Sequence, residues 1–199
     1  MTPLAYRFRP LSVSDLPLVG QWLNHPHVAE WWGDPVPALA AIKNHLADPA
    51  MDLFIVSFGD VPIGYQQSYD PHAEPDHPLR DQPIGTLGID QFIGEPTLIG
   101  RGHGSAFIRT FVEQSFAAGA PRVVTDPNPR NARAIRAYAK AGFHPIGQRR
   151  TLSGEALLMG CDAPAKATKE MSEWQPPDHR LVRARSPHRP PRAASRVSR

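Results

Sequence analysis

One carboxylate stands alone in an apolar segment near the middle of the sequence. Asp90 lies within Gly88-Ile-Asp-Gln-Phe-Ile, and burial of a charged side chain there is costly unless it is paired or faces a cleft. A second carboxylate, Asp126, follows the next predicted strand in Thr125-Asp-Pro-Asn-Pro, which also fits an ordinary turn. Because a carboxylate in a cleft can hold a cation or accept a proton, these two residues are the first candidates for chemistry.

A glycine-rich loop follows the segment that contains Asp90. In Gly100-Arg-Gly-His-Gly-Ser the glycines alternate with Arg101 and His103, and an amphipathic run begins at Ser105. Glycines let several backbone N–H groups turn toward one point, and the dipole of the following helix adds positive potential. The pattern predicts a phosphate-binding loop, with a plain strand-to-helix turn as the alternative. It matches neither the P-loop nor the dinucleotide-binding spacing.

Aromatic side chains supply further candidates. Trp31 and Trp32 are adjacent in a predicted loop and cannot both face one core, so at least one is expected to be partly exposed. An exposed aromatic face can stack on a sugar ring or a cation. Tyr138 lies late in a predicted helix, where its residue type alone fits core packing, and Asn131 is placed to cap that helix.

The elements that must position these residues alternate between strand and helix, which predicts a single α/β domain. Gly59-Asp60 is expected to turn a hairpin, Gly142 to end a helix, and the proline- and acid-rich segment 70–83 to form a loop. Strands are predicted at 4–11, 53–58, 63–69, 84–92, 122–125, 143–151 and 155–159, and helices from residue 14 and at 35–47, 104–118 and 131–141.

Composition and charge divide the chain into a domain at 1–162 and a tail at 163–199. Residues 1–162 hold 13 Lys/Arg against 16 Asp/Glu, whereas the tail holds 9 against 3 and is rich in Pro, Ser and Arg. The tail is predicted to be disordered. An acidic domain favours a cationic substrate. With one cysteine, Cys161, and no Cys/His grid, neither an intramolecular disulfide nor a metal site is expected.

The order of these motifs resembles that of the GNAT superfamily of acyl-coenzyme A N-acyltransferases. The glycine loop and the later Thr125-Asp-Pro-Asn-Pro-Arg-Asn segment, whose helix ends in Ala-Gly-Phe, carry the resemblance. His27-Val-Ala-Glu-Trp-Trp-Gly and Pro62-Ile-Gly-Tyr-Gln-Gln-Ser-Tyr make it similar to the aminoglycoside 6′-N-acetyltransferases, over residues 4 to about 160. The resemblance implies an α/β GNAT fold, with a mixed central sheet, splayed strands and flanking helices.

The resemblance also implies a role for each candidate residue. Asp90 would orient the substrate amine and accept its proton, and Tyr138 would protonate the departing thiolate. The substrate-binding set would be Trp31, Trp32, Asp90 and Asp126. Acetyl-coenzyme A, the implied acyl donor, would contact Gln91, Phe92, Ile93, Gly100, Arg101, Gly102, His103, Gly104, Ser105, Asn131 and Tyr138. The chain departs from the family's loop pattern at Ile99, where Gln or Arg is usual.

The implied activity is acetyl transfer to a primary amine, most directly the 6′-amine of an aminoglycoside, which would confer antibiotic resistance. One alternative acceptor is another small amine, such as a lysine-derived siderophore precursor. An alternative of another class is a coenzyme A-binding module that acts on nucleic acid through the basic tail; no aromatic interleaving supports a specific nucleic-acid partner. Without an apolar span or a secretory signal, we expect a cytoplasmic monomer or homodimer and no membrane partner.

Overall fold

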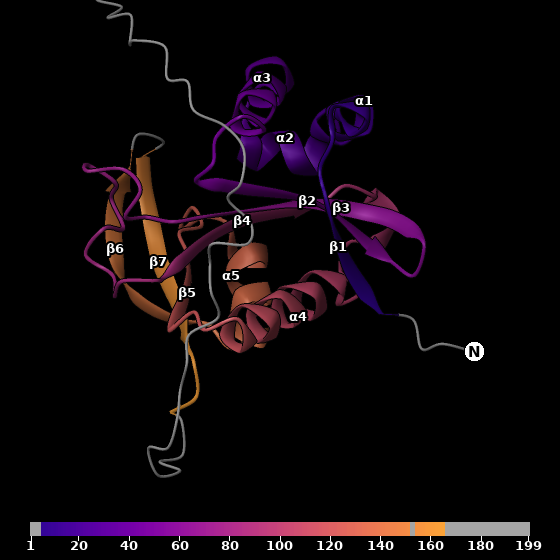
Figure 1. Ribbon diagram of the computed structural model, residues 1–199. Coiled ribbons are helices and arrows are strands. Elements are labelled where there is room, and N and C mark those ends of the chain that lie inside the picture. Colours follow the sequence, from indigo (N-terminus) through magenta and orange to yellow (C-terminus); the bar gives the residue numbers. More distant parts are fainter. Residues whose placement is uncertain (1–4, 152–153, 166–199) are drawn as a thin grey trace, which may run out of the picture. The chain divides into compact units, whose positions relative to one another are not determined.

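The computed structural model describes residues 5–151 and 154–165, so the predicted disorder of the tail falls almost wholly outside the described residues. Figure 1 shows a central sheet with helices on both of its faces. In chain order the strands are β1 (Tyr6–Pro10), β2 (Met51–Phe58), β3 (Val61–Tyr69), β4 (Leu87–Ile93), β5 (Arg122–Thr125), β6 (His144–Thr151) and β7 (Gly154–Asp162). The α-helices are α1 (Leu16–Leu23), α2 (Pro26–Trp32), α3 (Pro35–His45), α4 (His103–Ala117) and α5 (Ala132–Lys140).

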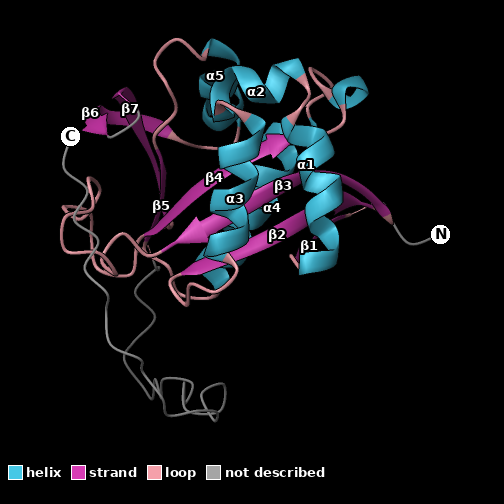
Figure 2. Cartoon of the chain, turned by 90° about the horizontal axis from the view of Figure 1, so that it is seen from above, coloured by secondary structure: helices cyan, strands magenta, loops and turns pink. Residues whose placement is uncertain are grey.

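The sheet has seven strands in the order β1-β2-β3-β4-β5-β7-β6. All neighbouring strands are antiparallel except β4 and β5, which are parallel and paired only at Leu87↔Val123 and Gly88↔Val124. On its other side β4 pairs with β3 as far as Ile93. The stretch of β4 from Asp90 to Ile93 therefore has one paired edge and one edge that diverges from β5. This confirms the expected mixed, splayed sheet (Figure 2).

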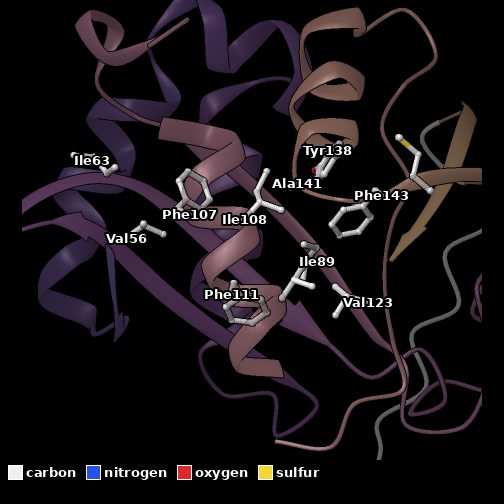
Figure 3. Close-up of a cluster of buried hydrophobic side chains, with 12 residues drawn as sticks. Val56, Ile63, Ile89, Phe107, Ile108, Phe111, Val123, Tyr138, Ala141 and Phe143 are labelled. Carbon is white, nitrogen blue, oxygen red and sulfur yellow. The ribbon is translucent and has the colours of Figure 1, made fainter. Parts of the chain in front are cut away.

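Two hydrophobic clusters cover the two faces of the sheet. Helices α1, α2 and α3 lie on one face, where Trp22, Tyr65 and Phe92 are buried, and α4 and α5 lie on the other (Figure 1). Figure 3 shows the second cluster, in which Phe107 of α4 and Tyr138 of α5 are buried. Because side chains alternate along a strand, Asp90 shares the α1–α3 face with Phe92.

Several predicted elements are confirmed with small shifts of their ends. Gly59, with φ 62°, turns the hairpin between β2 and β3. Gly142, with φ 104°, follows α5 as the predicted left-handed stop. The strand predicted to begin at Ile84 begins instead at Leu87. Gly85 has φ 84°, and the Thr86 N–H donates to the Pro83 carbonyl at 3.1 Å, so this segment turns before it enters the sheet.

The prediction of a loop at Trp31 and Trp32 is wrong, because both residues lie in the last turn of α2. This helix starts with Pro26 in its first turn and stops at Gly33, whose φ is 78°. A proline at the start and a glycine just past the end are the usual punctuation of a short helix. The sequence therefore contained the signal for α2. Helix α2 places the two indoles beside the diverging end of β4.

Candidate active site

The glycine loop joins the diverging end of β4 to the N-terminus of α4. Gly100 and Gly102 have φ 75° and 88°, a region in which residues with a Cβ are strained. Gly102 is the residue that caps α4. Gly104 lies in the first turn of the helix, where an added Cβ would meet Ile93 of β4 at 3.6 Å. The free N–H groups at this helix start form a natural anion-binding site.

An open groove of about 300 Å³ runs from α2 past the diverging end of β4 to the glycine loop and one side of α5. It passes from the face of the sheet that carries α2 to the face that carries α4. Eleven of the predicted site residues line it. These are Trp31, Trp32, Gln91, Phe92, Ile93, Gly100, Gly102, Gly104, Ser105, Asn131 and Tyr138.

Asp90 is held by a short chain of buried polar side chains on β3. The Tyr65 hydroxyl donates to Gln67 Oε1 at 2.8 Å, and Gln67 Nε2 donates to Asp90 Oδ2 at 3.0 Å. Burial raises the pKa of the Asp90 carboxyl, while the hydrogen bond from Gln67 and the charge of His45 lower it. Asp90 is thus a fixed carboxylate with an affinity for protons above that of an aspartate in water.

Asp126 lies just past the end of β5, across the divergence from Asp90. Its pKa is raised to about 7, first by burial and then by the negative charge of Asp90. Burial raises the pKa of Tyr69 well above its usual value, and the charges of Asp90 and Asp126 add to the rise. The Tyr69 ring lies over Gly88, where a Cβ would stand 2.2 Å from Tyr69 Cε2. Two carboxylates and a buried phenol therefore lie close enough to influence one another's ionisation.

Tyr138 points from α5 into the junction between the groove and the core. Gln91 Nε2 donates to the Tyr138 hydroxyl at 2.7 Å. Burial raises the pKa of this phenol, hydrogen bonds with Thr125 and Gln91 oppose the rise, and the charges of Asp90 and Asp126 add to it. A phenol that accepts from an amide and stays protonated keeps its own proton for donation.

The tryptophan pair forms one wall of the groove. The Trp32 ring meets Phe92 edge-on, with 5.0 Å between ring centroids, and meets Tyr65 at 5.7 Å. Both tryptophans are partly exposed, which satisfies the expectation that at least one would be. His27, on the same helix, donates from Nε2 to the Ile93 carbonyl at 2.9 Å. This bond ties α2 to the diverging end of β4.

Four predicted site residues do not line the groove. Asp90 and Asp126 are partly buried and do not line it, and the side chain of Arg101 is exposed. His103 is turned toward β1, where its Nδ1 lies 2.9 Å from the Tyr6 hydroxyl and its ring meets Phe58 edge-on. The imidazole of His103 is thus engaged in packing, and only its backbone lies at the predicted loop.

Sequence reasoning missed several residues that line the groove. They come from α2, the glycine loop, the body of α4 and one side of α5. These residues are His27, Val28, Ile99, Ile108, Arg133, Ala134, Arg136, Ala137 and Lys140. The α5 residues recur at intervals of three and four, which is the signal of a single helix face. The sequence could not show that this face borders a groove.

Among the described residues, no cluster of three or more His, Cys, Asp or Glu side chains could hold a metal ion. No described helix is both long and apolar enough to cross a bilayer.

Comparison with known proteins places this geometry in a family. The model of the acetyltransferase (GNAT) domain matches residues 12–151. The aminoglycoside N(6′)-acetyltransferase type 1 of Klebsiella pneumoniae is 35% identical over 160 residues, which cover 76% of this chain and 80% of that protein. The lysine N-acyltransferase MbtK of Mycobacterium tuberculosis is 25% identical over 168 residues, covering 81% of this chain and 80% of that protein.

Solved structures agree with this placement. An aminoglycoside acetyltransferase, AAC(6′)-Ib, in complex with coenzyme A and kanamycin superimposes with a TM-score of 0.71 at 33% identity, over 79% of this chain and 95% of that one. A complex of AAC(6′)-Ib with ribostamycin and coenzyme A gives a TM-score of 0.73 at 32% identity, over 84% and 99%. This chain therefore belongs to the GNAT acetyltransferase family, as an acetyl-coenzyme A-dependent N-acetyltransferase similar to the aminoglycoside 6′-N-acetyltransferases.

Proposed function

We propose that this enzyme transfers the acetyl group of acetyl-coenzyme A to the 6′-amine of an aminoglycoside antibiotic, and so confers resistance to it. The observation that carries the proposal is the interacting carboxylate pair of Asp90 and Asp126, together with a groove that has a glycine loop at one end. The similarity to aminoglycoside 6′-N-acetyltransferases at 35% identity supports the same acceptor. An aminoglycoside carries several ammonium groups, which a pair of carboxylates attracts.

The groove suits an acyl-coenzyme A in shape and in its polar groups. The glycine loop and the start of α4 offer backbone N–H groups for the diphosphate. The diverging edge of β4, from Gln91 to Ile93, offers backbone groups for the pantetheine amides, and Asn131 stands beside it at the start of α5. The Asn131 side chain accepts from the Ala134 N–H at 3.0 Å, so its own amide N–H groups are available to the donor.

The acceptor is placed on the α1–α3 face of the sheet. Trp31 and Trp32 provide aromatic surface for the sugar rings. Asp90, fixed by Gln67, holds the reacting ammonium and takes its proton, because a carboxyl with a raised pKa is a stronger base than an ordinary aspartate. Asp126 binds a second ammonium group of the same molecule.

The reaction then proceeds by direct attack. The neutral amine nitrogen forms a bond to the thioester carbonyl carbon, the carbon–sulfur bond breaks, and the electron pair leaves with sulfur. Asp90 takes one proton of the ammonium before the attack, Tyr138 delivers its phenolic proton to the thiolate, and the second proton that the nitrogen loses as the amide forms passes back to the Tyr138 phenolate. Gln91 donates to the phenol oxygen and so stabilises the phenolate that forms briefly.

A second candidate acceptor is a lysine-type amine, since the chain also resembles a lysine N-acyltransferase. A free lysine brings a carboxylate with its amine. The carboxylate pair of Asp90 and Asp126 would repel that group, so this pair favours the aminoglycoside. We place the enzyme in the cytoplasm as a monomer or homodimer; light scattering of the purified chain tests the oligomeric state.

The test of these roles is Asp90→Asn, which keeps the shape of the side chain and removes the base. Turnover with kanamycin should fall by about two orders of magnitude or more, while the affinity for coenzyme A stays unchanged. Asp76→Asn, in the exposed part of the 70–83 loop, is the matched control and should behave as the wild type. A near-normal kcat in Asp90→Asn would show that another group takes the proton.

A further inference from the structure

One side of α5 presents a row of cations to the groove. Arg133, Arg136 and Lys140 all line it, at intervals of three and four residues, so they share one helix face. From residue 127 to residue 143 the chain has no Asp or Glu. This basic wall stands in contrast to the excess of acidic residues over residues 1–162.

All three of these cations lack the carboxylate partner that four other arginines of the described chain have. In the described part of the chain, four arginines form ion pairs with aspartates: Arg7, Arg9, Arg122 and Arg149. Within the same ranges, no ion pair to a carboxylate involves Arg136 or Lys140, and both are exposed. They stand one helical turn apart, where like charges repel and disfavour the helix. An anion bound between them would turn this repulsion into a favourable arrangement.

Helix packing places the end of α5, which carries Lys140, against the second turn of α4. The Arg109 guanidinium, less than two turns into α4, donates to the Lys140 carbonyl, which joins the end of α5 to that helix. The glycine loop at the start of α4 and the cations of α5 therefore border the same groove. Arg133 is engaged differently, since it donates to the His27 carbonyl at 3.4 Å.

Coenzyme A carries two separate anionic groups, the diphosphate and a phosphomonoester at the 3′ position of its ribose. We propose that Arg136 and Lys140 form the subsite for this 3′-phosphate. Backbone N–H groups of the glycine loop suffice for the diphosphate, whereas a monoester with a charge near −2 requires side-chain cations. The subsite makes the enzyme discriminate coenzyme A from dephospho-coenzyme A. It rests on the diphosphate position proposed above.

The experiment compares the affinities of coenzyme A and dephospho-coenzyme A by isothermal titration calorimetry, with no acceptor present. The wild type should bind coenzyme A about tenfold or more tightly than the dephospho form, a ratio expected from one or two charge-assisted contacts. In the double variant Arg136→Ala/Lys140→Ala the two affinities should converge, because the affinity for coenzyme A falls while that for dephospho-coenzyme A stays the same. In the wild type the discrimination should also shrink as salt is added.

Matched variants separate charge at this subsite from general effects. Arg130→Ala removes an exposed cation of the same segment that does not line the groove, and it should leave the ratio unchanged. Arg136→Lys/Lys140→Arg keeps both charges and should retain the discrimination. Equal weakening of both ligands by the double variant, or equal binding of both by the wild type, overturns the proposal. Because no acceptor is used, the result does not depend on which amine is acetylated.

Discussion

Asp126 makes aminoglycoside binding dependent on pH in a range where an ordinary aspartate is fully ionised. With a pKa of about 7, the carboxyl is ionised in about one tenth of the molecules at pH 6 and in about nine tenths at pH 8. Only the ionised form attracts an ammonium group. The affinity for kanamycin should therefore rise by close to an order of magnitude from pH 6 to pH 8, and Asp126→Asn should bind more weakly at pH 8 and lose this rise.

The same shift predicts a change in stability whose sign follows from proton binding. The carboxyl has a pKa of about 7 when folded, against a model value of 3.8. Between these values the folded state binds more protons than the unfolded state, so the wild type loses stability as the pH rises through this window. A shift of about three units corresponds to about 4 kcal/mol at its limit. Asp126→Asn should thus be more stable than the wild type at pH 8 and equally stable at pH 3.

Calorimetry of kanamycin binding and thermal unfolding, both from pH 3 to 8.5 where the protein stays folded, measure the two effects. Asp76→Asn, on the exposed loop, serves as the control. A kanamycin affinity that varies with pH to the same extent in Asp126→Asn and in the wild type would refute the role of this carboxyl. So would an unchanged stability difference between the two proteins from pH 3 to pH 8.

Three further substitutions test other parts of the site. Gly88→Ala would place a Cβ 2.2 Å from Tyr69 Cε2. Thermal unfolding should therefore show a loss of about 1–3 kcal/mol in the free energy of unfolding. The control Gly147→Ala should be tolerated, because its nearest contact is the end of the Arg149 side chain at 3.5 Å. Tyr138→Phe should lower kcat by about two orders of magnitude with little change in KM, because it removes the acid and not a binding contact. Steady-state thiol release measures both constants. An unchanged kcat would show that water, and not Tyr138, protonates the thiolate. Gly102→Ala forces a residue with a Cβ to φ 88° at a cost of about 1–2 kcal/mol, and should raise the KM for acetyl-coenzyme A more than that for kanamycin.

Local patterns predicted the parts of the fold and site that depend on local chemistry. The glycine loop could be predicted because Gly100 and Gly102 adopt a backbone conformation that other residues avoid. The turn at Gly59 and the stop at Gly142 follow from the same preference. Asp90 stood out because a charge in an apolar strand requires a partner, and the structure supplies Gln67 as that partner.

The remaining features depend on contacts between distant parts of the chain. The bond from His27 to Ile93 joins residues 66 positions apart, and that from Gln91 to Tyr138 joins residues 47 apart. No local pattern encodes such pairs. The raised pKa of Asp126 comes first from its burial and then from the charge of Asp90 on the neighbouring strand, and both depend on how the sheet is assembled. Helix α2 is different, because Pro26 and Gly33 marked its ends and the prediction overlooked them.

The most direct test of the proposed function is acetyl transfer from acetyl-coenzyme A to kanamycin, followed by thiol release and by NMR assignment of the product. An aminoglycoside with a hydroxyl in place of the 6′-amine, a lysine-type amine and a reaction without acceptor serve as controls. We predict saturable turnover with kanamycin, acetylation at the 6′ nitrogen, and little turnover with the 6′-hydroxyl analogue. Equal turnover of both aminoglycosides, or turnover with the lysine-type amine alone, would contradict the assignment of the acceptor.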